Sequence, residues 1–193
     1  MSDLAGIGLT IALLIFNAFF VGAEFALISA RRTKIEPEAA EGKTIARITL
    51  YAMEHVSLMM AGAQLGITIC SLALGSISEP AIAHLIEVPA AALGVPQAWL
   101  HPVALVIALS LVTYLHVVFG EMVPKNIALA GPDRMAKALS PFLVAIVFVL
   151  YPVLWVLNGI ANVCLRLIRV QPKNEVTSTV TRDEVAGLVE ESH

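Results

Sequence analysis

The sequence predicts an all-α integral membrane protein, with three transmembrane helices and additional juxtamembrane or re-entrant helices. The first observation is composition: 58% of the 193 residues are hydrophobic, only 14% are charged, and the mean hydropathy is +0.84. In a soluble domain about 25% of the residues are charged. The second observation is the length of the apolar runs, each of which can cross a bilayer as a helix. These runs cover residues 4–30, 58–77 and 101–119.

The positions of the basic residues predict how these runs are oriented. Of the 12 Lys and Arg residues, all but Arg182 fall in the segments 31–47, 125–137 and 166–173. Basic residues are retained on the cytoplasmic side of membranes. Three spans that start from an external N-terminus place all three segments in the cytoplasm. We therefore expect a multi-pass protein of the plasma membrane (the inner membrane in bacteria), with its N-terminus outside and its C-terminus in the cytoplasm.

A further apolar segment, residues 140–165, admits two interpretations. It is long enough for a fourth span, but a fourth span would place the basic segment 166–173 outside the cell. It also carries residues that disfavour a continuous helix, namely Pro141, Pro152, Asn158 and Gly159. We therefore read it as two short helices that dip into the membrane and return, or that lie along the inner leaflet. The competing interpretation is that the chain has four ordinary spans and weakly violates the rule that basic residues stay in the cytoplasm.

The segments between the spans are expected at the two membrane surfaces. The first run is too long for the core of a signal peptide and ends in basic residues, so we read it as a retained span. Residues 35–57 interleave basic and apolar side chains, which predicts an amphipathic helix on the cytoplasmic surface. Residues 78–100 contain no Lys or Arg and should form the external connection, with a short helix at 81–86.

The sequence Gly-Glu-Met-Val-Pro-Lys at residues 120–125 is the most informative motif. Glu121 directly follows an apolar run, and a carboxylate at membrane depth indicates a functional site by default. Pro124 cannot donate a backbone hydrogen bond, so we expect a helix break that frees backbone carbonyls. Carbonyls and a carboxylate are suitable ligands for a hard cation. The simpler alternative is that Glu121 pairs with Lys125, four residues later.

The second span carries a polar seam beside small residues. Gln64, Thr68 and Ser71 are spaced so that they share one face of a helix. Gly62 and Gly66 allow another helix to approach closely. The seam therefore either forms hydrogen bonds between helices or faces an ion path.

Several classes of function are disfavoured. The basic residues are scattered at membrane ends and not gathered on one face, so we expect no nucleic-acid partner. The sequence shows no nucleophile–base pair and no phosphate-binding loop, which disfavours an enzyme. His116 is better explained as a packing residue than as a ligand, and Cys70 and Cys164 as buried hydrophobic residues. Without a Cys/His cluster, zinc and copper are disfavoured on ligand softness.

The chain divides into a transmembrane domain at residues 1–170 and a linker with the start of a cytoplasmic helix at 171–193. Thr181 and Glu184 are three residues apart in the pattern of a capping box, which predicts that a helix begins there. Because this helix has nothing to pack on before His193, we expect the chain to be the membrane module of a longer protein.

Three blocks in this order resemble the CorC/CNNM family, which includes hemolysin-like proteins with CBS domains. The segment that begins at Thr181 also resembles the helix leading into the family's CBS pair. The blocks are Asn-Ala-Phe-Phe-Val-Gly-Ala-Glu-Phe-Ala-Leu-Ile-Ser-Ala-Arg-Arg at 17–32, Gln-Leu-Gly-Ile-Thr-Ile-Cys-Ser-Leu at 64–72 with Gly75 through Pro80, and Gly-Glu-Met-Val-Pro-Lys-Asn at 120–126.

The resemblance implies a homodimeric divalent-cation transporter in the lipid bilayer that exports Mg²⁺, with exchange for Na⁺ left open. It also implies three spans with a belt of juxtamembrane helices. The family's cytoplasmic CBS domains do not follow in this sequence, so this chain is not expected to bind ATP. Animal members carry a serine and an asparagine where this chain has Val21 and Glu24. The charge of the site in the first span therefore differs from theirs.

We hypothesise a Mg²⁺ site inside the membrane that is built from oxygen ligands. Mg²⁺ takes about six oxygens and gives up its water reluctantly. Glu121, Ser71 and Ser29 would contribute side chains, and the break at Gly120 would contribute a carbonyl. Glu24 is either a further ligand or a second carboxylate that binds the counter-ion.

Two functions stay open at this stage. Paired carboxylates in a polar membrane seam favour a Mg²⁺ transporter. The alternative is a membrane sensor or scaffold that binds the cation and regulates another transporter, which needs one binding site but no path. A third function, pore-forming toxin, is suggested only by the word hemolysin in the family's name, and the retained spans argue against it.

Overall fold

The computed structural model describes residues 3–94 and 96–168, and these are helical apart from short connections. The predicted all-α class is confirmed, because no strand occurs in this described part of the chain. The described residues group into two units, one up to Leu150 and one from Tyr151 onward. The predicted helix start at Thr181 lies outside the described residues.

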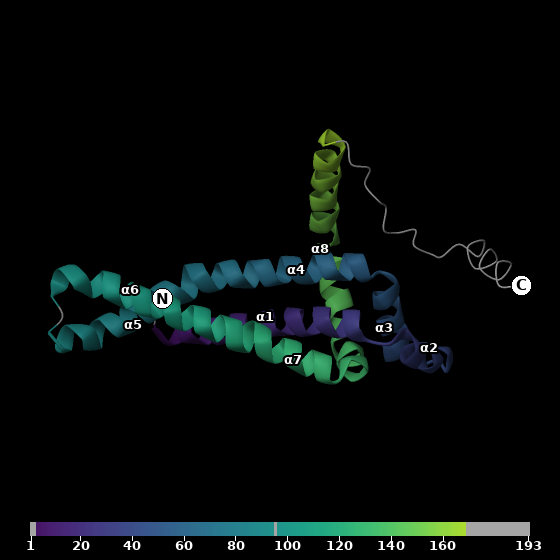
Figure 1. Ribbon diagram of the computed structural model, residues 1–193, viewed down its shortest axis with the longest axis horizontal. Coiled ribbons are helices and arrows are strands. Elements are labelled where there is room, and N and C mark those ends of the chain that lie inside the picture. The colour runs from purple at the N-terminus through teal and green to yellow at the C-terminus, as the bar shows by residue number, and fades with distance from the viewer. Residues whose placement is uncertain (1–2, 95, 169–193) are drawn as a thin grey trace, which may run out of the picture. The chain divides into compact units, whose positions relative to one another are not determined.

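The centre of the first unit is an antiparallel pair of helices, α1 (Asp3–Ser29) and α4 (Val56–Ala73), shown in Figure 1. Gln64 of α4 donates a hydrogen bond to Glu24 of α1 over 3.4 Å. The close approach predicted from small residues is confirmed: a Cβ added to Gly66 would lie 2.5 Å from the ring of Phe20. Small residues in α4 thus let a side chain of α1 pack directly on the α4 backbone.

Two short helices, α2 (Arg32–Ala40) and α3 (Thr44–Glu54), connect α1 to α4. The turn between them uses Gly42 at a φ of +89°, which a residue with a side chain rarely adopts. The single amphipathic helix expected at 35–57 is therefore two helices. Of these, α3 is amphipathic, with Ala46, Thr49 and Ala52 on its buried face.

In the connection expected at 78–100, the helix is longer than the short one predicted at 81–86. Helix α4 continues through a π-helical turn, η1 (Leu74–Ser78), into α5 (Glu79–Ala92). Pro80 lies in the first turn of α5, directly after the π-helical turn. The chain then returns as α6 (Gln97–Leu115), which packs on α5 through Ala83, Ala104 and Ala108.

The expected helix break at Pro124 is wrong. Helix α6 continues through a second π-helical segment, η2 (His116–Met122), into α7 (Val123–Ala130). The wider π turn accommodates the proline, which sits in the first turn of α7. The proline therefore changes the hydrogen bonding of the preceding turn and leaves the helix continuous.

Residues 132–167 form one helix, α8 (Pro132–Leu167), so the prediction of two short helices at 140–165 is wrong. Pro152 removes one hydrogen-bond donor, and the surrounding apolar turns keep the helix intact despite this cost. By length and composition, four helices can cross a membrane. They are Ala5–Ser29, Val56–Ala92, Gln97–Ala130 and Pro132–Leu165.

Within the first unit, the beginning of α8 crosses the α1–α4 pair and does not run alongside it. A Cβ on Gly22 of α1 would lie 3.5 Å from Leu139, and one on Gly62 of α4 would overlap Cγ2 of Val147. Leu139 and Val147 are about 12 Å apart along α8. Leu139 lies against α1 and Val147 lies against α4, so this stretch of α8 passes over both helices.

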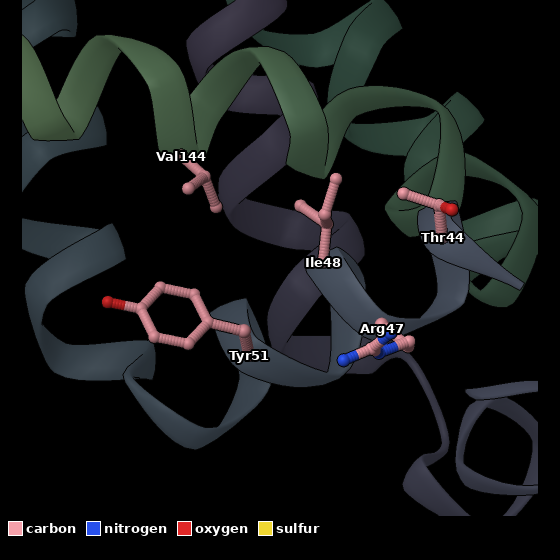
Figure 2. Close-up of a pocket in the computed structure, with 5 residues that line it drawn as sticks. All are labelled: Thr44, Arg47, Ile48, Tyr51 and Val144. Atoms are coloured by element: carbon pink, nitrogen blue, oxygen red, sulfur yellow. The ribbon is translucent and has the colours of Figure 1, made fainter. Parts of the chain in front are cut away.

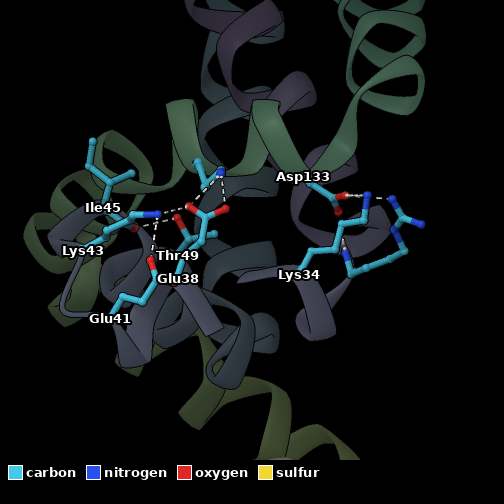
Figure 3. A network of polar contacts seen from close by, with 9 residues as sticks. Lys34, Glu38, Glu41, Lys43, Ile45, Thr49 and Asp133 are labelled. Atoms are coloured by element: carbon cyan, nitrogen blue, oxygen red, sulfur yellow. Dashed lines mark hydrogen bonds and ion pairs between the residues drawn. The ribbon is translucent and has the colours of Figure 1, made fainter. Parts of the chain in front are cut away.

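Ion pairs join α2 and the end of α1 to the start of α8, as Figure 3 shows. Lys137 donates two hydrogen bonds to Glu38, at 2.8 and 3.0 Å. The hydrogen bond from the Lys137 ammonium, followed by the charges of Lys137 and Lys43, holds the pKa of Glu38 below its ordinary value. Asp133 accepts from the backbone N–H of Arg31 at 2.9 Å and from its guanidinium at 3.0 Å.

Candidate cation site

The carbonyl oxygen of Gly120 lies four residues before Pro124, which has no N–H to donate to it in an α-helical pattern. In the π-helical segment η2 this oxygen binds a side chain: Nδ2 of Asn17 donates to it over 2.9 Å. A buried amide of α1 thus binds the Gly120 carbonyl, and the role of this carbonyl as a metal ligand stays a prediction.

A second polar contact lies at the same level of the bundle. Ser71 Oγ of α4 and His116 Nε2 of η2 are 3.2 Å apart. A Cβ on Gly120 would lie 2.9 Å from the ring of His116 and 3.1 Å from Asn17 Nδ2. Asn17, Ser71, His116 and Gly120 therefore form one cluster, which we call the polar cluster.

The spacing along α1 and α4 agrees with this convergence. Glu24 and Gln64 contact each other, and the two helices are antiparallel. Asn17 lies seven residues before Glu24, and Ser71 lies seven residues after Gln64. Each step is two helical turns, about 10 Å, in the same direction in space. Two polar levels therefore stand one above the other along the α1–α4 contact.

The side chain of Asn17 carries an oxygen atom, Oδ1, that can coordinate a cation. The side chain is 1% exposed, and its Oδ1 has no hydrogen-bond partner. A buried polar atom without a partner is rare in proteins and requires an explanation such as a bound ion or water. An amide oxygen, a hydroxyl and a backbone carbonyl in one cluster are hard oxygen ligands of the kind that Mg²⁺ and Ca²⁺ bind. In the described ranges, no three His, Cys, Asp or Glu side chains are grouped to hold a metal.

The structure brings together only part of the predicted ligand set. Gly120 and Ser71 belong to the polar cluster. Glu121 follows Gly120, but its side chain is exposed on the single chain. Glu24 lies two turns from the cluster, bound to Gln64. Ser29 is the last residue of α1, about 18 Å along the helix from Asn17.

The suggested Glu121–Lys125 pair does not form in the described part of the chain. The ammonium of Lys125 lies 4.6 Å from the ring centroid of Phe25 on α1, a cation–π contact. Glu121 therefore remains free to face a partner outside the single chain.

Sequence reasoning missed Asn17 as a member of the cluster and gave His116 a packing role only. A signal for Asn17 was available, because a glycine four residues before a proline has an orphaned carbonyl. A buried amide elsewhere in the membrane is a suitable donor for it. The sequence does not say which polar residue of the first span supplies that donor.

The sequence of this chain is similar to those of several known proteins. The family described as the cyclin M transmembrane N-terminal domain (CNNM) matches residues 8–193. An uncharacterized protein of Mycobacterium tuberculosis, MT1889, is 45% identical over 192 residues, covering 100% of this chain and 54% of its own length. The UPF0053 protein YhdT of Bacillus subtilis is 31% identical, covering 100% of this chain and 42% of its own length. The chain thus spans about half the length of the curated relatives it matches.

Proposed function

The chain belongs to the cyclin M (CNNM) family of membrane proteins, and from this premise we propose that it transports a divalent cation, Mg²⁺. The proposed direction is export, with Na⁺ as a candidate counter-ion. Mg²⁺ is the substrate and would bind without most of its water in the polar cluster. The family membership supports a membrane protein of the CorC/CNNM type, and the polar cluster supports the choice of a hard cation.

The observation that carries this proposal is the orphaned Oδ1 of Asn17. The amide that carries it donates to the Gly120 carbonyl, and the Ser71 hydroxyl contacts His116 in the same cluster. An uncharged set of oxygens compensates poorly for the dehydration of Mg²⁺. The nearby carboxylates of Glu121 and Glu24 would supply the negative charge that such an ion requires.

The two polar levels along α1 and α4 suggest a path. Glu24 and Gln64 lie nearer the end of α1 that carries the basic residues 31–34. A cation that enters from that end would meet Glu24 first and the polar cluster about 10 Å further on. In this scheme Glu24 is either a transient ligand or the site of the counter-ion.

We place the C-terminal end of α1 and the N-terminal end of α4, which the basic connection 31–47 joins, in the cytoplasm, with three spans crossing the membrane. The first part of α8 would then lie along the inner leaflet, because it crosses α1 and α4 about 10 Å from the end of α1. We also propose a homodimer. A second copy would cover the exposed carboxylate of Glu121, which would otherwise face lipid at a high cost.

The test is Mg²⁺ flux from liposomes that hold this chain, followed with a trapped Mg²⁺-sensitive dye. Ser71→Ala should slow saturable flux by about tenfold or more, since substitutions around a metal commonly weaken its binding by that factor. Ser110→Ala is the matched control, because that exposed hydroxyl bonds only to Val106 O of its own helix. Wild-type rates in Ser71→Ala, or in Glu121→Ala, would remove the respective residue from the site.

The same experiment separates the transporter from the cation sensor. Saturable Mg²⁺ binding by the purified chain without any flux would support the sensor.

A further inference from the structure

A hollow of about 300 Å³ opens between α3 and the first part of α8. Its walls are Thr44, Arg47, Ile48 and Tyr51 of α3 and Val144 of α8, drawn in Figure 2. The side chains of Ile48 and Val144 both point into the gap between the two helices in that view. The lining is therefore an apolar wall with a guanidinium, a phenol and a hydroxyl at its edges.

The hollow lies at the boundary of the membrane. Helix α3 ends at Glu54, two residues before the candidate span that begins at Val56. Its outer face carries exposed apolar side chains, with Ile45 54% and Tyr51 45% exposed. An amphipathic helix with a basic residue and exposed apolar groups lies in the interface between headgroups and acyl chains.

Arg47 is left without an anionic partner among the described residues, whereas the other basic residues of α2 and α3 are paired. Arg32 binds Glu36 and Glu54, and these are the carboxylates of a second hollow that Arg47 also lines. Lys43 binds Glu41 at 3.0 Å and approaches Glu38 at 3.9 Å. The local carboxylates are thus engaged elsewhere, and the Arg47 guanidinium can receive an external anion.

We propose that this hollow binds one anionic phospholipid, with its headgroup phosphate on Arg47. The planar guanidinium pairs with phosphate in a bidentate geometry. Thr44 and Tyr51 can donate further hydrogen bonds at the rim. The first carbons of an acyl chain lie against Ile48 and Val144. A free phosphate ion can pair with Arg47, but it leaves the apolar wall of the hollow exposed to water. A phospholipid covers both parts of the lining, so the lining favours a lipid.

A lipid in this position bridges α3 and α8 within the first unit. It holds the connection between the first two spans against the helix that crosses them. This proposal rests on the membrane location and the hollow, and it does not depend on Mg²⁺ transport.

Native mass spectrometry of the purified chain in detergent, titrated with phosphatidylglycerol or phosphatidylcholine, tests the proposal. We expect one phosphatidylglycerol to bind more tightly than phosphatidylcholine, and Arg47→Gln to weaken it by about tenfold, the order of one charge-assisted contact. Arg134→Gln is the matched control, because this exposed arginine of α8 also has no ion pair in the described part of the chain. Its effect should stay below about twofold.

Arg47→Lys sharpens the test, since it keeps the charge but loses the bidentate geometry, and it should fall between wild type and Arg47→Gln. Equal effects of Arg47→Gln and Arg134→Gln would show a general charge effect and overturn the site. Displacement of the lipid by millimolar inorganic phosphate would overturn the lipid as occupant. A change in oligomeric state of Arg47→Gln without a change in lipid binding would assign the hollow to a second copy instead.

Discussion

The crossing of α8 over α4 can be tested with a single added carbon. A Cβ on Gly62 would overlap Cγ2 of Val147, whose side chain is 1% exposed and cannot swing into open space. Gly62→Ala should therefore destabilise the fold by about 1–3 kcal/mol, the usual cost of overpacking a filled core. Val147→Ala removes the overlapping atom and leaves Cβ at 3.4 Å, at the edge of ordinary contact.

The pair of substitutions forms a double-mutant cycle. Val147→Ala alone should also destabilise, since it loses about two methyl groups of packing, near 0.8 kcal/mol each. In the double variant the two changes compensate, so its loss should be smaller than the sum by about 1–3 kcal/mol. Reversible unfolding in mixed micelles with increasing SDS, followed by circular dichroism, measures each free energy.

A matched control separates this clash from a general effect of alanine. Gly8→Ala in α1 places its Cβ where nothing lies within 4 Å. It should be neutral or slightly stabilising, because alanine favours helix over glycine by about 1 kcal/mol. Additivity of Gly62→Ala and Val147→Ala within about 0.5 kcal/mol would show that the two residues do not touch, and would refute the crossing.

Two further predictions concern the π-helical segment η2 and the ion pair between α2 and α8. Gly120→Ala forces a Cβ to within 3.1 Å of the Asn17 amide and should abolish Mg²⁺ flux, whereas Gly75→Ala in the other π segment meets nothing within 4 Å and should leave flux unchanged. Equal flux in both variants would contradict a site at Gly120. The Lys137 ammonium lowers the pKa of Glu38 in the folded protein. The stability from this pair is complete above the unfolded pKa and is lost as the pH falls through the folded pKa, so thermal unfolding of Glu38→Gln should depend less on acid than wild type. The same acid dependence in both proteins would show that Glu38 does not contribute.

The sequence was sufficient to predict the helical membrane class and the close packing of α4, because both follow from short-range properties. Long apolar runs can satisfy their backbone only as helices in a membrane. Gly66 has no side chain, so the ring of Phe20 can lie against the backbone of α4, as the small residues of this span predicted. What could not be predicted was continuity: Pro80, Pro124 and Pro152 all lie within continuous helical segments. Whether a proline ends a helix depends on tertiary contacts that compensate for the lost hydrogen bond.

The same limit applies to the candidate site. The motif indicated that a carbonyl near Gly120 would be freed, since Pro124 has no N–H. The partner of that carbonyl, Asn17, is 103 residues away and is defined only by how α1 packs on η2. Ser29 and Asn17 lie in the same apolar run, and composition cannot say which of them reaches the centre. Only the antiparallel alignment of α1 with α4 distinguishes them.

Equilibrium binding of Mg²⁺ to the purified protein, measured by calorimetry, tests the central claim most directly. Asn17→Ala removes the orphaned oxygen, and Asn126→Ala makes the same change at an exposed position of α7. We predict saturable binding by the wild type and by Asn126→Ala, and binding weakened by about tenfold or more in Asn17→Ala. Equal Mg²⁺ affinity in all three proteins, with Asn17→Ala still folded, would contradict a cation site at the polar cluster.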